Sequence, residues 1–428
     1  MKIMFVSTRY HPNEVGGAEE TVRLLAEGLV RAGDQAVVVS LAPDGVPQER
    51  VINGVHVYYV PLFNVFFPHQ SKRQPAWRKV LWQVVEAWNP VMAARLGWIA
   101  DREAPDLIHI HNALGFTCAI WPTLARRGLP MLQTLHDHYA ACTNSVMYRS
   151  DVNCTRRCLR CRVLCWPRVR LSRHVDGLTS VSARLWQRIS PSGLFRRRRL
   201  TRVINNCNSD PPVVVPYPGP RPGAPLRVGF LGRLERIKGA HVVLEAARRI
   251  GAERVQVYIG GFGQAEYERN LKESFRSPLA TFLGRVAPAA FFQDLDILVA
   301  PSLVEEASGR VIHEAFGFGV PVIGVSAGGM VELIRDGCTG FLVPAGDITA
   351  LETLLRRLLD DPPDWRTMSA ACLLEAERFT FDRIFGEYSA AWQDVLRTHP
   401  TASKHRAIRE SGRAMPMPRI GDARTTTP

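Results

Sequence analysis

The stretch DILVAPSLVEEASGRVIHEAFGFGVPVIG, residues 296–324, contains the features that decide the fold. Its first part, DILVAPS, is a short apolar run rich in Ile, Leu and Val, which predicts a strand buried on both faces. From Ser308, a good N-cap residue, apolar side chains recur at helical spacing, so a helix is predicted to begin there. Strands that alternate with helices in this way are typical of a parallel sheet in an α/β protein.

Two carboxylates, Glu306 and Glu314, bracket the start of this predicted helix. The free N–H groups of Gly309, Arg310 and Val311 form an anion site, and Gly309 has no side chain to block a ligand. Carboxylates suit sugar hydroxyls better than phosphates. The stretch therefore indicates a ligand with both groups. The alternative is a simple Arg310–Glu314 pair at i,i+4 spacing, with Glu306 in solvent.

The same alternation runs through the whole chain. Strand-like runs in the first half are KIMFVS, AVVVSLA, VHVYYVP, DLIHIHN, MLQTLHD and GLTSVS, and an amphipathic segment at residues 18–31 ends at Gly33. Those in the second half are LRVGFLGR, VQVYIGG, ATFLGRV, DILVAPS, PVIGVSA and GFLVPA. This order predicts two doubly wound parallel sheets, with ligands bound in a cleft between them at the strands' carboxyl ends.

Composition places the domain boundaries. Residues 211–225 contain seven prolines and predict a semi-stiff linker between a first domain at 1–210 and a second at 226–378. The first domain carries a Cys-rich and Arg-rich insertion at about 142–202. We expect residues 379–398 to form a helix that crosses back to the first domain, and the polar segment 399–428 to be disordered.

The overall composition is that of a globular protein. Of 428 residues, 46% are hydrophobic and 22% charged. The sequence has no apolar run of the roughly 18–20 residues that cross a bilayer, and its start lacks the features of a signal peptide. We therefore expect a cytoplasmic protein, peripheral on the inner face of the membrane, with reduced thiols.

Positive charge is concentrated in residues 156–202. This segment holds fourteen arginines and one acidic residue, Asp176, and so supplies nearly all of the net charge of +14. It predicts an anionic partner, either a membrane surface or a phosphorylated substrate, or else a solvated basic face. We expect an anionic membrane and no nucleic acid, because the aromatic interleaving of nucleic-acid platforms is missing. Apolar residues in the segment that could enter the headgroup layer are Trp166, Leu171, Leu185, Trp186, Leu194 and Phe195.

Two basic residues lie at the end of a predicted strand in the second half of the chain. Gly232 and Arg233 end the LRVGFLGR strand, and Lys238 and Gly239 open the next helix. Two cations beside a glycine turn suit a diphosphate. The glycines at 260–263 would let a ligand approach the backbone, although they also fit an ordinary turn.

The order of these motifs resembles a known family. GRLERIKG, YIGGFG, FLGRV, PSLVEEASGRVIHEAFGFGVPVIG, GGMVELI and DGCTGFLVPAGD follow one another as in the retaining glycosyltransferases of family 4, and GGAEE, DLIHIHN and QTLHDHY are similar to that family's first domain. The resemblance covers roughly residues 1–395. It implies the GT-B fold, in which two Rossmann-like domains face each other across a cleft.

The resemblance also implies roles for matching residues. His136 would face the donor sugar, Glu306 would act near the reacting carbon, and Glu314 would contact the ribose. Arg233 and Lys238 would hold the donor diphosphate. The other donor-binding positions are Gly16, Gly17, Gly261, Arg285, Val286, Ser308, Gly309, Arg310 and Val311. Ser308 departs from the Phe of many members, which leaves the shape of the sugar pocket open.

The implied reaction moves a sugar, with retained configuration, from a UDP, GDP or ADP sugar to a hydroxyl of a sugar or lipid-linked acceptor in cell-surface glycan synthesis. No cofactor is expected for catalysis, since the sequence has no Asp-x-Asp metal motif. One alternative is a nucleotide-sugar epimerase on the same fold, which would need no acceptor. Another is a non-catalytic basic binding protein, which would leave the motifs of the second half unexplained.

Five cysteines crowd into residues 142–165. The last four, Cys154, Cys158, Cys161 and Cys165, have the spacing C-x3-C-x2-C-x3-C. This spacing suits a structural Zn²⁺ ion, and free thiols are the alternative.

Overall fold

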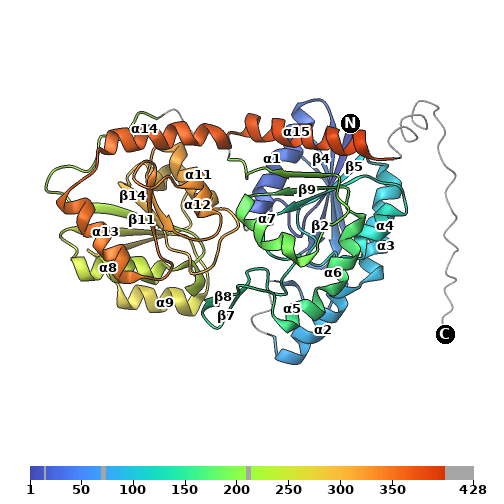
Figure 1. Ribbon diagram of the computed structural model, residues 1–428, viewed down its shortest axis with the longest axis horizontal. Helices are drawn as coiled ribbons and strands as arrows, with labels where there is room; N and C mark the ends of the chain where they lie inside the picture. Colours follow the sequence, from blue (N-terminus) through green and yellow to red (C-terminus); the bar gives the residue numbers. More distant parts are fainter. Residues whose placement is uncertain (14–15, 69–73, 209–213, 401–428) are drawn as a thin grey trace.

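The computed structural model describes residues 1–13, 16–68, 74–208 and 214–400. It contains two large sheets in two separate domains (Figure 1). The first sheet has eight strands in the order β10 (Leu200–Val203), β9 (Gly177–Ser180), β6 (Met131–Leu135), β5 (Leu107–Ile110), β1 (Lys2–Val6), β2 (Gln35–Ala42), β4 (Val55–Pro61) and β3 (Gln48–Ile52). All its pairings are parallel except that of β3 with β4.

The second sheet is parallel throughout. Its strands lie in the order β13 (Ala280–Gly284), β12 (Val255–Gly260), β11 (Leu226–Leu231), β14 (Ile297–Ala300), β15 (Val322–Val325) and β16 (Gly340–Val343). A small hairpin, β7 (Tyr148–Arg149) with β8 (Val152–Asn153), lies outside both sheets. The predicted fold of two doubly wound Rossmann-like domains is confirmed.

Helices cover both faces of the first sheet, so its strands are apolar on both sides. Ile3 and Phe5 of β1 pack beneath α1 (Gly17–Arg31) and α15 (Phe381–Thr398). Met4 and Val6 point to the opposite face. There they pack with α3 (Pro90–Glu103), α4 (Ile120–Ala125) and α7 (Ala183–Ile189).

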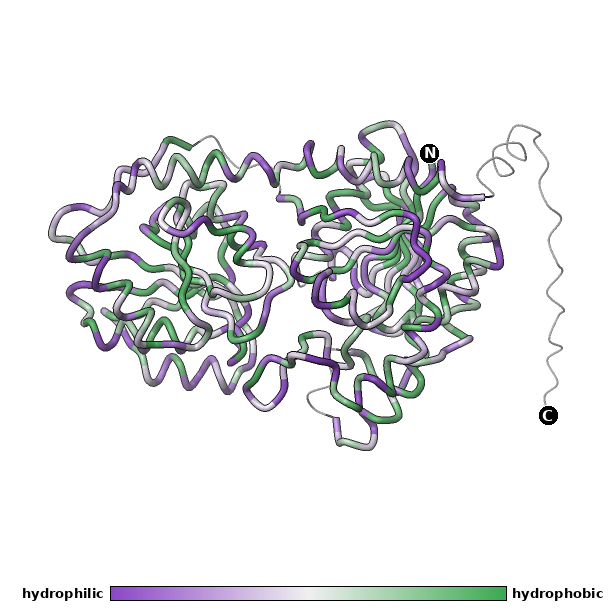
Figure 2. Tube along the Cα trace, viewed as in Figure 1, coloured by the Kyte–Doolittle hydropathy of each residue, from purple (hydrophilic) through white to green (hydrophobic). Residues whose placement is uncertain are grey.

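The second sheet is covered in the same way. One face packs against α8 (Ala240–Ile250), α9 (Ala265–Ser274) and α13 (Ile348–Asp360). The other packs against α10 (Pro288–Phe292), α11 (Arg310–Gly317), α12 (Met330–Leu333) and α14 (Trp365–Ala376). Figure 2 shows the hydrophobic stretches concentrated in the middle of each domain.

The chain returns to the first domain at its end. After α14, helix α15 lies along the first sheet, where Tyr388, Trp392 and Val395 are buried in the same core as Phe5 (Figure 1). Residues 209–213 and 401–428 lie outside the described residues, and with them part of the predicted linker and nearly all of the predicted tail. Residues 214–225 contain no helix or strand.

Three further helices complete the first domain: α2 (Ala76–Ala87), α5 (Leu159–Leu164) and α6 (Trp166–Leu171). Helices α2 and α5 contact each other at the lower end of the domain in Figure 1. Across the described residues, every helix is too short or too polar to cross a membrane.

The predicted N-cap at Ser308 is wrong. Helix α11 begins at Arg310, its N-cap is Gly309 without a side-chain bond, and the Ser308 hydroxyl has no hydrogen-bond partner in the described structure. The reason is that the preceding loop is held in an irregular path: Gly329 N–H donates to Glu306 O over 2.7 Å, and Ser182 Oγ donates to Ala307 O.

Candidate active site between the two domains

A cation and a carboxylate meet at the carboxyl ends of β11 and β14. Lys238 Nζ lies 2.6 Å from Glu306 Oε1, and Ser302 Oγ donates to the same oxygen over 2.6 Å. These strands are neighbours in the sheet, which brings residues 68 positions apart together. The side chains of Lys238 and Glu306 are 25% and 19% exposed, so both can reach a ligand. Glu306 is thus paired, not free in solvent.

Two arginines, Arg233 of the second domain and Arg9 of the first, are further cations near this site. Arg233, 53% exposed, makes a single ion pair of 3.2 Å with Glu235 among the described residues. Partial burial and then the charge of Arg233 lower the pKa of Arg9, which follows β1 in the first domain, while Glu19 opposes the shift. Arg9 of the first domain is therefore within electrostatic reach of Arg233 of the second domain. Sequence reasoning missed Arg9.

Glycine is required where the loops of this site approach each other. Gly239 has φ +80°, and a Cβ atom there would lie 2.2 Å from Pro301 O. Gly261 has φ +118°, and a Cβ atom there would lie 1.9 Å from Gly232 O. Any larger residue would push apart the loops after β11, β12 and β14.

The loop with Glu306 rests on a second glycine pair, which opens the GGMVELI motif and was given no role of its own from the sequence. A Cβ atom on Gly328, which has φ +62°, would lie 2.5 Å from Glu306 O, and one on Gly329 would lie 2.4 Å from Ala307 O. On the first-domain side, Ala183 N–H donates to Glu332 Oε2 over 2.9 Å. These contacts hold the loop across the domain interface.

An open cavity of about 850 Å³ lies at this interface. From the first domain His138 and Arg188 line it, and from the second Glu306 and Gly328 do so. Burial and then Arg188 lower the pKa of His138 to about 4, while the charge of Glu306 opposes the shift. His138 is therefore a neutral imidazole near the carboxylate at neutral pH. Sequence reasoning missed this histidine, since its neighbour His136 carried the resemblance.

The predicted pair at the start of α11 forms. Arg310 Nε lies 3.1 Å from Glu314 Oε1, and Arg310 Nη2 lies 4.0 Å from Glu20 Oε1 of α1. A Cβ atom on Gly17 would lie 2.8 Å from Arg310 Cδ, so this glycine lets α1 pack against α11. Burial raises the pKa of Glu314, with Arg310 opposing. Gly16 is the N-cap of α1 and has extended backbone.

Three of the predicted donor-binding positions, Gly261, Arg285 and Val286, lie at the ends of β12 and β13. Gly261 N–H donates to Gly284 O over 2.6 Å, which joins the two loops. The guanidinium carbon of Arg285 lies 5.3 Å from the ring centre of Phe262, which is 49% exposed. Val286 is packed against the core beneath α10 and α11. An exposed aromatic ring beside an arginine suits stacking on a base; Phe262 carried no signal in the sequence.

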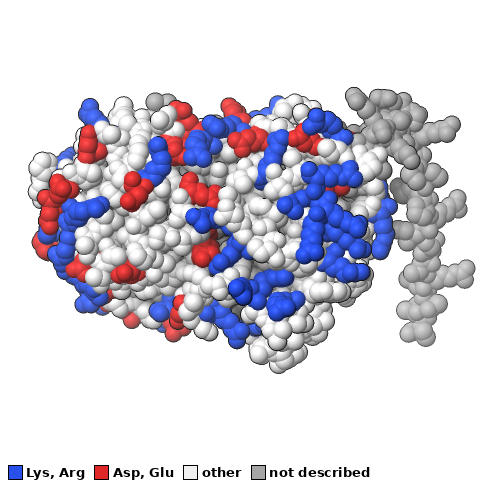
Figure 3. Space-filling view, in the orientation of Figure 1, with Lys and Arg blue, Asp and Glu red and all other residues white. Residues whose placement is uncertain are grey.

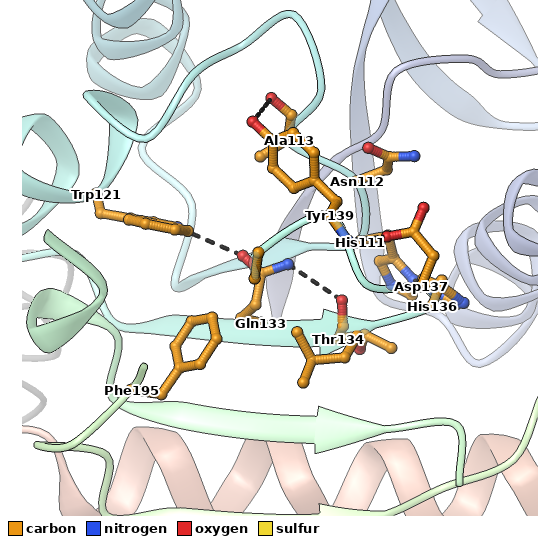
Figure 4. A pocket seen from close by; sticks show the side chains of 12 residues that line it. His111, Asn112, Ala113, Trp121, Gln133, Thr134, His136, Asp137, Tyr139 and Phe195 are labelled. Carbon is orange, nitrogen blue, oxygen red and sulfur yellow. Dashed lines mark hydrogen bonds between the residues drawn. The ribbon is translucent and has the colours of Figure 1, made fainter. Parts of the chain in front are cut away.

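His136 lines a separate, much smaller cavity within the first domain, with room for little more than one water molecule. Figure 4 shows His111, His136 and Asp137 together on one side of this cavity, Trp121 and Phe195 on the other, and Gln133 between them. His138 thus lines the interdomain cavity and His136 lines the smaller one; that His136 faces the donor sugar stays a prediction.

His136 ends a chain of hydrogen-bonded imidazoles. His136 Nε2 lies 2.8 Å from His111 Nδ1, His111 Nε2 lies 3.1 Å from His109 Nδ1, and Trp392 Nε1 donates to the same His109 nitrogen over 3.1 Å. Burial lowers the pKa of all three histidines, that of His136 to about 4. Each ring is therefore neutral and carries one N–H.

The tryptophan decides which nitrogen carries each proton. An indole N–H only donates, so His109 Nδ1 must accept. His111 then donates from Nε2 and accepts at Nδ1, and His136 donates from Nε2. This leaves His136 Nδ1 as an acceptor without a close hydrogen-bond partner in the described structure, although the Asn206 side chain partly opposes the lowering of the His136 pKa by burial. Trp392 of α15 thus sets the orientation of the His136 imidazole through His109 and His111.

A buried clamp fixes the loop that carries these histidines. Tyr139 Oη donates to Glu86 of α2, and Gly115 N–H donates to Glu86 Oε2 over 3.1 Å. Arg168 of α6 lies with its guanidinium carbon 4.0 Å from the Tyr139 ring centre. Burial raises the pKa of Glu86 to about 7, with Arg168 opposing. Helices α2 and α6 therefore both position the loop after β6.

The substitution Glu86→Gln is expected to change how stability depends on pH. Unfolded, the carboxyl ionises near pH 4.5; folded, near 7. Between these values the folded chain holds a proton that the unfolded chain has released, so the wild type loses stability as pH rises. The variant lacks this term, so its stability relative to wild type should rise by on the order of 1–3 kcal/mol from pH 4.5 to 7. Urea unfolding across this range measures the difference. Glu273→Gln, at an exposed position, is the control, and parallel curves for Glu86→Gln and wild type would contradict the assignment.

The arginine-rich segment does not form one basic face. Arg168 is buried, Arg188 donates to Cys154 O over 2.7 Å, and Arg202 pairs with Asp394 of α15. These three arginines therefore cannot contact a membrane, and membrane docking through the other arginines stays a prediction. The prediction that Leu185, Leu194 and Phe195 could enter the headgroup layer is wrong, because all three are buried in the first core.

Four of the five cysteines lie together in one small cluster. The Sγ atoms of Cys142 and Cys161 lie 3.7 Å apart, and Cys154 and Cys158 pack against them. In the part of the chain described here, no group of three or more His, Cys, Asp or Glu is arranged to hold a metal ion. A structural zinc site on Cys154, Cys158, Cys161 and Cys165 stays a prediction, which elemental analysis would test.

The two domains match two family models. Residues 15–207 match "Glycosyltransferase Family 4", and residues 225–361 match "Glycosyl transferases group 1". Together they span both sheets and the cleft between them. The predicted resemblance to family 4 glycosyltransferases is confirmed.

Individual relatives are similar to the chain over most of its length. An "Uncharacterized 42.6 kDa protein in cps region" from Klebsiella pneumoniae is 26% identical over 338 residues, 78% of this chain and 88% of the relative. Glycogen synthase from Mycobacterium tuberculosis is 26% identical over 439 residues, 98% of each chain. The crystal structure of Anabaena Alr3699/HepE with UDP superposes with a TM-score of 0.67 at 19% identity, covering 92% of this chain and 100% of the other. The chain therefore belongs to the glycosyltransferases with the GT-B fold, and it is an enzyme built from a family 4 domain and a group 1 domain.

Proposed function

We propose that the protein transfers a sugar from a nucleoside-diphosphate sugar, with UDP as the first choice of nucleotide, to a hydroxyl of a lipid-linked or cell-surface glycan acceptor, with retained configuration. The observation that carries the proposal is the Lys238–Glu306 pair beside a cavity that both domains line. Cations suit the diphosphate, and the carboxylate suits sugar hydroxyls. UDP is preferred because the Anabaena neighbour holds UDP.

The proposed chemistry needs charge stabilisation in a closed cleft. The bond between the sugar's anomeric carbon and the diphosphate oxygen breaks, and the acceptor oxygen bonds to that carbon on the same face. The acceptor's proton passes to the departing diphosphate. Lys238, Arg233 and Arg9 would stabilise the developing negative charge. Glu306 would hold the sugar, and the neutral imidazoles of His136 and His138 would line its other side.

The proposed acceptor class has a separate support. The name of the Klebsiella relative places that protein in a cps region. A lipid-linked or cell-surface glycan acceptor is polymerised or carried at a membrane, which fits an enzyme that works as a peripheral protein on the cytoplasmic face. No cofactor is needed for this transfer, because protein cations supply the charge.

The test has two stages. Thermal shift with UDP, GDP and ADP identifies the nucleotide, since a ligand at about 100 times its Kd adds about 2.7 kcal/mol to the free energy of unfolding. Transfer from the matching sugar nucleotide to a lipid-linked acceptor is then followed by NMR of the anomeric proton. An inverted product overturns retention. Conversion of the donor to its epimer without an acceptor overturns transfer and favours an epimerase.

A further inference from the structure

Helix α2 presents an apolar stripe to the outside of the protein. Trp77, Val80, Leu81 and Val84 recur at i, i+3, i+4 and i+7, and their exposed fractions run from 45% to 65%. This spacing normally marks the face that a helix buries in its core. Here the buried side chains of the helix are Trp82 and Glu86 instead. Within the described structure the stripe is left uncovered.

Helix α5 and the start of α6 add a second stripe. Leu159, Val163 and Trp166 recur at i, i+4 and i+7, and they are 74%, 62% and 60% exposed. Helices α2 and α5 contact each other, so the two stripes lie on adjacent helices. We call these seven side chains the docking surface. Scattered single apolar residues are normal on a protein surface, but a contiguous set marks an interaction site.

Basic side chains border the docking surface, and acids are missing from it. Five arginines of this region are exposed and have no ion pair among residues 1–13, 16–68, 74–208 and 214–400: Arg156, Arg160, Arg162, Arg170 and Arg173. Over residues 76–88 and 156–174 the single acidic residue is Glu86, which is buried. Figure 3 shows blue side chains gathered over the part of the first domain where Figure 1 places α5 and α6.

We propose that the docking surface binds the headgroup layer of an anionic lipid bilayer. Tryptophans and aliphatic side chains enter this layer, and arginines beside them pair with lipid phosphates. A second copy of the chain is poorly suited to the docking surface, because a two-fold interface would bring the arginines of one copy against the same arginines of the other, and like charges repel. The chain's residues 401–428 are a poor occupant too, since they carry six basic and two acidic residues.

The surface is also joined to the active site. Glu86, on the inner side of α2, accepts from Tyr139, which lies one residue after His138. A docked α2 would thus hold the first-domain wall of the cleft close to the bilayer. This part of the inference rests on the proposed lipid-linked acceptor, whereas docking itself does not.

Sedimentation of the full chain with vesicles tests the proposal. Binding should be weak with phosphatidylcholine alone, rise with the fraction of phosphatidylglycerol, and fall with salt. Arg160→Gln, Arg162→Gln and Arg170→Gln combined should weaken binding about 100-fold, since each basic side chain near a charged surface contributes about five-fold. Trp77→Ser with Leu159→Ser should weaken it more than about tenfold, even at low salt.

A matched control uses the second domain. Leu374→Ser, at a position 63% exposed on α14, with Arg269→Gln and Arg366→Gln, should leave vesicle binding unchanged.

A blue shift of tryptophan fluorescence that Trp166→Phe reduces would support insertion. Binding that ignores lipid charge, or equal losses in the control, would overturn the proposal. So would a dimer in solution that Trp77→Ser converts to monomer. UDP binding is measured on each variant to separate the two proposals. If the protein binds UDP but does not bind vesicles, only the docking proposal is overturned. If it binds vesicles but does not bind UDP, only the proposed function is overturned.

Discussion

Replacing both Arg233 and Lys238 with alanine is expected to lower the affinity for UDP by two to four orders of magnitude. Each residue would lose a charge-assisted contact to the diphosphate, worth roughly 1.5–3 kcal/mol. The two losses should add approximately, because the two side chains have different ion-pair partners, Glu235 for Arg233 and Glu306 for Lys238. Lys238 already pairs with Glu306 over 2.6 Å, so its single variant should show the smaller effect.

Isothermal titration with UDP at fixed ionic strength measures this loss. Arg248→Ala with Lys272→Ala is the matched control, since it removes the same residue types from α8 and α9 of the same domain, where each pairs with a glutamate of its own helix. An affinity within about twofold of wild type in the Arg233 and Lys238 double variant would show that the diphosphate binds elsewhere.

The substitution Glu306→Gln is expected to lower kcat by roughly 100- to 1000-fold while UDP binding stays near the wild-type level. A group whose interaction strengthens in the transition state typically contributes this much. The bare nucleotide has no donor sugar for Glu306 to hold. Removal of the carboxylate charge also frees Lys238 from its ion pair, which should favour the diphosphate.

Comparison with Glu314→Gln makes the result specific. Glu314 is predicted to contact the ribose, which is part of UDP, so its variant should lose UDP affinity as well as turnover. Glu245→Gln on the surface of α8 serves as the control for a lost carboxylate in the same domain. If both cleft variants lost UDP affinity equally, the division of roles between Glu306 and Glu314 would be void.

The sheets could be predicted because strands buried on both faces are continuous apolar runs, and all six runs named in each half are strands. Lys238 and Glu306 could be named individually, yet their ion pair depends on β11 lying beside β14. His138 could not be separated from His136, since the turn after β6 decides which imidazole lines the interdomain cavity.

The stripe of α2 shows a different limit. Trp77, Val80, Leu81 and Val84 have the spacing of a core-facing helix, and the same spacing would serve a membrane-facing one. The periodicity of a sequence shows which face of a helix is apolar. Whether that face is buried depends on which other elements of the fold pack against it. Arg168 shows the converse: it belongs to the most basic part of the sequence, yet it is buried beside Tyr139.

The return of α15 has a consequence for how the chain folds. The core of the first domain combines Phe5 with Tyr388, Trp392 and Val395, so contacts near the start of the sequence are completed almost 400 residues later. When the first domain leaves the ribosome, the apolar surface that α15 will cover is still exposed to solvent. This surface can be buried only after the whole second domain has been synthesised. Folding of the first domain is therefore completed only when the second domain is present.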